Sequence, residues 1–180
     1  KKKKQILCPS KKQQNQEIHM FKLFKKKQPI AATGKIPQHI AFICDGNRRW
    51  AENRGLPPLM GHQAGITNFE NLVDWFMKRG VSTITFFVFS TENWNRSKEE
   101  VDFLMDLFYT ELKKNLKNAI DKNLRYRVIG SRARLPEKLA KLCDELEEKS
   151  AEHTGGTIVF ALNYGGKDEI VDAANAAIAN

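Results

Sequence analysis

The chain reads His39-Ile-Ala-Phe-Ile-Cys-Asp45-Gly-Asn-Arg-Arg-Trp50 where its body begins. The first half of this stretch is a short continuous apolar run, which is typical of a buried strand in an α/β protein. The second half places a carboxylate, a carboxamide, two guanidinium groups and an indole directly after that run. Ligands of open α/β sheets bind beyond the carboxyl ends of the strands. The stretch therefore predicts a strand leading into a site, although Asp-Gly and Gly-Asn are also common in ordinary surface turns.

Short apolar segments alternate with helical patterns through the rest of the body. The pattern predicts strands over 40–44, 83–89, 124–129 and 157–162, and helices over 47–54, 61–79, 97–123, 136–150 and from 168 onward. Ser97 followed three residues later by Glu100 predicts a capping box at the start of the long helix. This alternation indicates a mostly parallel central sheet flanked by helices. The last predicted helix reaches Asn180 without a cap signal, so we expect the domain to be C-terminally truncated.

Composition divides the chain into a basic tail and a nearly neutral body. Residues 1–36 contain eleven lysines and one acidic residue, whereas residues 37–180 contain 19 basic and 20 acidic groups, so the net charge of +9 comes from the tail. The lysine- and glutamine-rich tail is expected to be disordered. Residues 1–19 are interpreted as a solvated arm or as non-native sequence, and residues 20–30 leave open a contact with anionic lipid. A neutral body disfavours nucleic acid as a partner.

Cysteine usage and hydropathy indicate a cytoplasmic setting. The three cysteines are far apart and form no metal-binding or disulfide spacing. The longest apolar run of the body, Phe86 to Phe89, is far too short to span a bilayer. We therefore expect a cytoplasmic protein, with peripheral contact at the inner face of the membrane as an open alternative.

Polar side chains follow each of the four predicted strands. They form the groups Asp45-Gly-Asn-Arg-Arg-Trp50, Ser90-Thr-Glu-Asn-Trp-Asn-Arg96, Gly130-Ser-Arg132 and Asn163-Tyr-Gly-Gly-Lys167. The carboxyl ends of parallel strands lie at one edge of a sheet, so these groups are expected to converge. Guanidinium, carboxamide, hydroxyl and glycine amide groups bind phosphate oxygens. Asp45 could hold a Mg²⁺ ion shared with those oxygens, since Mg²⁺ favours few carboxylates plus substrate phosphates.

These residues resemble the cis-prenyltransferases, and most closely the bacterial undecaprenyl diphosphate synthases. The matching blocks are His39-x-Ala-x-x-x-Asp-Gly-Asn-x-Arg-Trp-Ala51, Arg54-Gly55 with Gly61-His-x-Ala-Gly65, Phe89-Ser-Thr-Glu-Asn-Trp-x-Arg96 and Asn163-Tyr-Gly-Gly166. They occur in order over most of residues 37–180. The resemblance implies a homodimeric α/β fold with a hydrophobic tunnel. It also implies Mg²⁺-dependent condensation of isopentenyl diphosphate onto farnesyl diphosphate, giving a cis-polyprenyl carrier lipid for cell-wall sugars.

The resemblance also implies a role for each site residue. Asp45 would engage Mg²⁺ and the diphosphate of the incoming isopentenyl unit, and Asn93 would assist removal of the proton from that unit. A carboxamide is a poor base, so a phosphate oxygen or Ser90 is expected to share that task. The remaining residues would bind substrate: Gly46, Asn47, Arg48, Arg49 and His62 at the allylic diphosphate, Trp50 and Trp94 as walls, Ser90, Thr91 and Glu92 in the pocket lining, and Arg96 near the leaving group.

Apolar side chains at helical spacing on 62–79 and 97–122 allow two interpretations. Such stripes are usually ordinary core, whereas the resemblance implies that some line the tunnel. The sequence leaves the division open among Ile66, Phe69, Val73, Phe76, Leu104, Met105 and Phe108.

The chain also departs from the family pattern. Pro58 stands where many members have a phosphate-binding arginine, Arg48 replaces a frequent glycine, and Lys167 replaces an arginine. The arginine-rich segment that binds isopentenyl diphosphate in the family, and a glutamate that completes its Mg²⁺ site, are not among these 180 residues. We therefore expect an enzyme whose 180-residue chain is inactive or nearly so when isolated. The alternative is a non-catalytic or truncated diphosphate-binding relative.

Overall fold

The computed structural model describes residues 34–179, without the side chains of residues 118–120 and 179. The expected disorder of the tail and its possible lipid contact concern residues that lie almost entirely outside this range. Residues Ile36–Asn180 form one compact unit.

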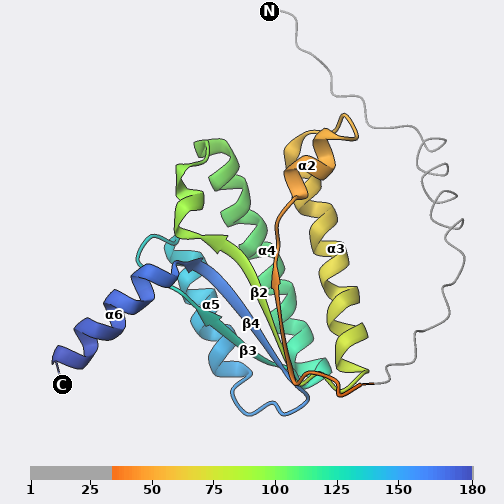
Figure 1. Cartoon of the computed structure of the whole chain (residues 1–180), viewed down its shortest axis with the longest axis vertical. Coiled ribbons are helices and arrows are strands. Elements are labelled where there is room, and N and C mark those ends of the chain that lie inside the picture. Colours follow the sequence, from red (N-terminus) through yellow and green to blue (C-terminus); the bar gives the residue numbers. More distant parts are fainter. Residues whose placement is uncertain (1–33, 180) are drawn as a thin grey trace, which may run out of the picture. The chain divides into compact units, whose positions relative to one another are not determined.

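The unit is built on a four-stranded parallel sheet. The strands are β1 (His39–Ile43), β2 (Thr83–Ser90), β3 (Arg125–Ile129) and β4 (Thr157–Tyr164), arranged in the order β1-β2-β4-β3. Every neighbouring pair is parallel. The predicted α/β class and parallel sheet are therefore confirmed, and the carboxyl ends of all four strands lie at one end of the sheet (Figure 1).

The helices connect these strands. They are α2 (Asn47–Glu52), α3 (Pro58–Met77), the 3-10 helix η1 (Thr91–Asn95), α4 (Lys98–Lys122), α5 (Glu137–Lys149) and α6 (Gly166–Ala179). The prediction placed the start of α3 at Gly61, but the helix begins at Pro58. Proline suits the first helical position because its missing N–H would be unpaired there in any case. Strand β4 is longer than predicted, so Asn163 and Tyr164 belong to the strand end rather than to the following turn.

Helices α3 and α4 cover one face of the sheet. Strand register aligns Phe42 with Phe86 and Phe86 with Phe160, so all three rings project from the same face. Phe69 of α3 packs on both Phe86 and Phe160, with ring centroids 4.3 and 5.5 Å apart. Figure 1 shows α3 beside β1, with α4 next to it. The aromatic face under these helices forms the main core of the described residues.

Strand β1 is an edge strand, which corrects the prediction of a buried strand. Its residues are exposed or half-buried in alternation, and Ile43 is 78% exposed. An apolar run also forms when one face of an edge strand packs on helices and the other face does not, and hydropathy alone does not separate the two cases. At the opposite edge, α5 protects β3: the backbone N–H of Tyr126 donates to Ser150 Oγ, and that of Val128 donates to Glu147 Oε1. Such pairing removes free edge donors.

In the described part of the chain, no helix is both long enough and apolar enough to cross a bilayer.

Candidate functional site

A polar pocket of about 250 Å³ lies at the carboxyl end of the sheet, beside β1 and the start of α3. It joins residues from three segments that are distant in sequence, because parallel strands end at the same edge. Its lining consists of Cys44, Asp45, Gly46, Asn47, Arg48, Arg49, Glu52, His62 and Arg96. Seven of the predicted site residues thus lie around one small cavity.

An apolar cavity of about 440 Å³ lies next to the polar pocket, between the sheet and helices α3 and α4. Its walls are mainly aromatic and aliphatic, with Asn115 and Glu111 among the few polar residues. The two cavities share Cys44, Asp45, Asn47, His62 and Arg96. The shared lining means that a charged head in the polar pocket could continue directly into an apolar tail.

The apolar cavity shows which apolar side chains of α3 and α4 line a void and which belong to the core, a question that the sequence left open. Ile66, Phe69, Leu104 and Phe108 line it. Val73 and Met105 are buried in the core, with Phe76 packed against it, and none of the three is part of the cavity lining in the described residues. The helical period places all of these side chains on the sheet-facing sides of α3 and α4. Only the separation between the two helices decides which of them face a void.

Asp45 lies directly after β1 and is well exposed, with 77% of its side chain accessible. Its Oδ1 accepts the backbone N–H of Gly46 at 2.5 Å, and its Oδ2 pairs with Arg49 at 3.0 Å. Gly46 has a φ of 85°, a left-handed conformation that glycine adopts without steric cost, and this turn starts α2. No cluster of three or more acidic, histidine or cysteine side chains suited to a metal occurs among the described residues. Mg²⁺ commonly combines one or two carboxylates with substrate phosphate oxygens.

Two glycines of α3 bring Asn47 close to the helix. A Cβ built on Gly61 would lie 1.9 Å from the backbone oxygen of Asn47, and one on Gly65 would lie 3.0 Å from its carboxamide. Both glycines are on the same side of α3, four residues apart. This gives a physical reason for the Gly-His-Gln-Ala-Gly block, since any larger residue would push Asn47 and α2 away from the pocket.

Glu100 contacts two arginines and His62 of the pocket, and the sequence did not identify it as a site residue. Its Oε1 lies 2.9 Å from Arg96 and 3.5 Å from His62 Nε2, and its Oε2 lies 3.4 Å from Arg48. The predicted capping box is half formed. The backbone N–H of Glu100 donates to Ser97 Oγ at 3.3 Å, but the carboxylate turns to the cations. The sequence signal that could have revealed it was the i, i+4 spacing of Arg96 and Glu100.

The imidazole of His62 is poised to bind an anion. Its Nε2 is buried and lacks a partner at hydrogen-bond geometry within the described residues, with Glu100 at 3.5 Å as its nearest ion-pair contact. His62 lies in the second turn of α3, so it is not a helix cap. Burial lowers the pKa of His62 below its usual value, while the Glu100 carboxylate opposes this shift and Arg96 and Arg48 add to it. A buried donor without a partner is costly, and a phosphate oxygen would satisfy it.

Binding of a diphosphate at His62 is expected to take up protons. Burial holds the pKa of the free ring below its usual value, which favours the neutral imidazole. An adjacent anion favours the imidazolium and raises this pKa. Net proton uptake should therefore appear in the pH range between the free and bound pKa values. Titration calorimetry with farnesyl diphosphate in two buffers of different ionisation enthalpy measures it.

The ligand also titrates, so the quantity to compare is the difference between the wild type and His62→Asn. Equal proton uptake by the two proteins would show that His62 does not contact the anion.

Ser90 and Asn93 form a reciprocal pair at the end of β2. The backbone N–H of Ser90 donates to Asn93 Oδ1 at 3.1 Å, and Ser90 Oγ accepts the backbone N–H of Asn93. Both residues line the apolar cavity. The NH₂ group of Asn93 is a donor suited to a phosphate oxygen, and its carboxamide oxygen keeps a second lone pair beside the bond from Ser90.

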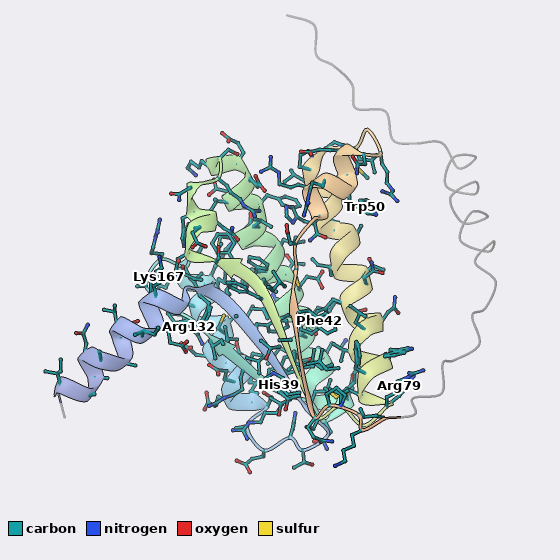
Figure 2. The ribbon with its side chains drawn as sticks, in the orientation of Figure 1. His39, Phe42, Trp50, Arg79, Arg132 and Lys167 are labelled. Carbon is teal, nitrogen blue, oxygen red and sulfur yellow. The ribbon has the colours of Figure 1, made fainter. Side chains whose placement is uncertain are left out.

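The other predicted site residues have different surroundings. Trp50 is 40% exposed and stacks on Arg54, with the guanidinium carbon 4.3 Å from the ring centroid. Figure 2 shows it on α2, near the end of α3 opposite Arg79. Glu92 is exposed and Thr91 is half-buried in η1. Trp94 donates its indole N–H to Asn163 Oδ1 at 2.7 Å. None of these four residues lines either of the two cavities in the described part of the chain.

Arg132, which follows β3, forms ion pairs with α5 and is not part of the polar pocket lining in the described residues. It pairs with Asp144 at 3.2 Å and with Glu147 at 2.9 Å. The expected convergence of polar groups therefore holds for the segments after β1 and β2, and the end of β4 joins them through Asn163 and Gly165.

A polar anion pocket that opens into an apolar cavity, at the carboxyl end of a parallel sheet, defines a class of α/β protein suited to amphipathic ligands. The family model described as putative undecaprenyl diphosphate synthase matches residues 43–180. The chain therefore belongs to the prenyltransferase family of undecaprenyl diphosphate synthases, which confirms the resemblance found in the sequence.

Individual relatives agree with this assignment. An isoprenyl transferase of Thermotoga maritima is 48% identical over 139 residues, covering 77% of this chain and 60% of that protein. A ditrans,polycis-undecaprenyl-diphosphate synthase of Vibrio parahaemolyticus, specific for (2E,6E)-farnesyl diphosphate, is 44% identical over 146 residues, covering 81% and 58%. Among solved structures, lavandulyl diphosphate synthase from Lavandula x intermedia, in complex with dimethylallyl diphosphate, gives a TM-score of 0.76 at 35% identity, covering 80% and 62%. The chain thus spans about three fifths of the length of these relatives.

Proposed function

We propose that the protein elongates an allylic diphosphate, such as farnesyl diphosphate, with isopentenyl diphosphate to give a cis-polyprenyl diphosphate. The observation that carries this proposal is the shared lining of the polar pocket and the apolar cavity. Such an arrangement suits a ligand with an anionic head and a hydrocarbon tail. The relatives named for farnesyl-specific synthesis and for a dimethylallyl diphosphate complex support the same class of substrate.

The pocket residues would hold the diphosphate of the allylic substrate. Arg49 and the Nε2 of His62 can donate to its oxygens, and the amide of Asn47 lies beside them in the pocket lining. Arg48 and Arg96 are partly neutralised by Glu100, so an entering diphosphate competes with this carboxylate for them. Charge-assisted hydrogen bonds of this kind supply much of the affinity for phosphate groups.

Mg²⁺ is proposed as the cofactor, with Asp45 as its protein ligand and diphosphate oxygens as further ligands. When bound, it would neutralise negative charge on the diphosphate and so make that group easier to displace. Asp45 suits this role because it is exposed at the pocket and fixed by Gly46 and Arg49.

The reaction breaks the allylic C–O bond, forms a C–C bond to the isopentenyl unit and removes one proton from that unit. The cationic side chains stabilise the departing diphosphate, while the aromatic cavity keeps water away from the electron-deficient carbon. Asn93 would hold a phosphate oxygen through its NH₂ group. The proton would then go to a diphosphate oxygen, because a neutral carboxamide is a poor base.

The proposal extends to assembly and location. Helix α6 carries Ile170, Val171 and Ile178 with 71, 57 and 84% exposure. Apolar side chains this exposed are suited to burial against further protein, in keeping with a homodimer of the whole protein. A product with a long hydrocarbon chain supports a cytoplasmic enzyme that acts at the inner face of the membrane.

The test is product formation by the whole gene product. With farnesyl diphosphate, radiolabelled isopentenyl diphosphate and Mg²⁺, we expect a butanol-extractable polyprenyl product. We expect this product to be lost with excess EDTA and restored by added Mg²⁺. The 180-residue chain, assayed in parallel, is expected to bind farnesyl diphosphate but to make little product. Binding of farnesyl diphosphate without turnover by the whole protein would instead identify a non-catalytic relative.

A further inference from the structure

Asn163, at the end of β4, is a buried polar residue in an uncommon backbone conformation. Its φ is 51° and it is only 2% exposed. Asparagine enters the left-handed region more readily than most residues, but the conformation still costs free energy that surrounding contacts must offset. Gly130 packs directly on it: a Cβ there would lie 2.9 Å from the Asn163 backbone oxygen. The carboxyl end of β4 is therefore held in one backbone conformation.

The carboxamide of Asn163 joins two loops that follow other strands. Its Nδ2 donates to the backbone oxygen of Ser131 at 2.7 Å, after β3, and its Oδ1 accepts the indole N–H of Trp94 at 2.7 Å, in η1 after β2. Both ends of the amide are thus paired, which is what a buried amide requires. A second contact joins the same segments, because a Cβ on Gly165 would lie 2.6 Å from Thr91 Oγ1.

Trp94 links Asn163 to residues that line the two cavities. It directly follows Asn93, and its ring packs edge-on against Phe89 with centroids 5.1 Å apart. Phe89 and Asn93 line the apolar cavity. Arg96, two residues after Trp94, lines both cavities. Trp94 lies in the five-residue η1 between Asn93 and Arg96, the residue that follows η1, so the indole contact helps to hold this segment together with the Ser90–Asn93 and Arg96–Glu100 contacts.

We propose that Asn163 is a positioning residue for prenyl transfer. It holds η1 through the Trp94 indole N–H, so that Asn93 and Arg96 face the diphosphate. This role rests on the proposed function. A displacement of about 1 Å at a reacting centre can cost about a hundredfold in rate, so losing this single hydrogen bond should affect turnover more than binding.

Two variants separate this role from general stability. Asn163→Gly keeps the left-handed backbone available and removes only the carboxamide. Trp94→Phe removes the indole N–H and keeps an aromatic ring against Phe89. Asn123→Gly is the matched control, since Asn123 also has a positive φ, of 52°, but lies away from both cavities.

In the whole gene product we expect Asn163→Gly and Trp94→Phe each to lower kcat about tenfold or more, with KM for farnesyl diphosphate changed less than about threefold. The double variant should resemble Asn163→Gly, because both single variants remove the Trp94–Asn163 bond and Asn163→Gly also removes the bond to Ser131. Asn123→Gly should retain wild-type kcat.

A spectroscopic measurement follows the bond independently of activity. The 180 residues contain three tryptophans, Trp50, Trp75 and Trp94, and each contributes one indole N–H resonance to a ¹H–¹⁵N spectrum. In Asn163→Gly, the Trp94 indole N–H should move upfield and exchange faster with solvent, while those of Trp50 and Trp75 stay unchanged.

The outcomes separate the two proposals. Wild-type protein without turnover overturns the proposed function and the positioning role together. Active wild type with equally active Asn163→Gly overturns only the positioning role. A loss of kcat with an unchanged Trp94 resonance also overturns it, because the effect would then follow another route. If Asn163→Gly does not fold, a wild-type kcat in Trp94→Phe overturns it.

Discussion

Replacing Asp45 by asparagine is expected to lower the rate of prenyl transfer by at least about a hundredfold, the scale of losing one group that stabilises transition-state charge. Asparagine has nearly the same shape and can still accept the backbone N–H of Gly46. It has no negative charge with which to bind Mg²⁺. The measurement is initial rate against Mg²⁺ concentration in the whole gene product, with saturating substrates.

The fold of this variant should be almost unaffected. The Asp45–Arg49 pair is largely exposed, with 77 and 73% of the side chains accessible, and exposed pairs contribute only about 0–1 kcal/mol. Asp102→Asn is the matched control, because Asp102 is also an exposed carboxylate paired i, i+4, with Lys98, and lies outside both cavities. Near-wild-type turnover in Asp45→Asn would overturn the assignment of Asp45 to the metal.

Replacing Leu107 by tryptophan is expected to shorten the polyprenyl product by at least one isoprene unit. Leu107 lines the 440 Å³ apolar cavity from α4 and is half-buried, so a larger ring there occupies space that the growing chain would need. The first condensations should proceed normally, because the polar pocket is untouched. Chromatography of dephosphorylated products from the whole gene product measures the chain-length distribution.

The control for this variant is Lys117→Trp, which adds the same ring at an exposed position of α4 outside the cavity. Forcing a larger side chain into a packed region typically costs about 1–3 kcal/mol, so thermal unfolding should accompany the product analysis. A folded Leu107→Trp protein with the wild-type product length would show that the chain does not grow through this cavity.

The elements were predictable because they depend on local chemistry. Alternating apolar and helical patterns gave four strands and the major helices, and parallel topology followed from their alternation. The observed bounds of an element differ from the predicted ones where two local rules apply to the same residue. The helix predicted to start at Gly61 begins at Pro58, because proline, which ends a helix when it lies inside one, suits the first turn of the next.

The residues of the site were predictable from the sequence, but the contacts between them were not. The motif blocks indicated Asp45, Asn47, Arg49 and His62, and the structure brings these residues around one pocket. Glu100 was interpreted from the sequence only as a helix cap, because a capping box is a contact within four residues. Its contact with His62 joins different helices, and no local pattern encodes it.

By itself the sequence determined the α/β class, the parallel sheet and the family, since these depend on periodicity and on short motifs within contiguous segments. Only the tertiary structure decided that β1 is an edge strand, that Phe69 faces the cavity whereas Val73 joins the core, and that Asn163 holds Trp94 across 69 residues. The physical reason is that such contacts depend on how separate elements pack. Hydrogen bonds between distant segments form only after packing has brought their partners within about 3 Å.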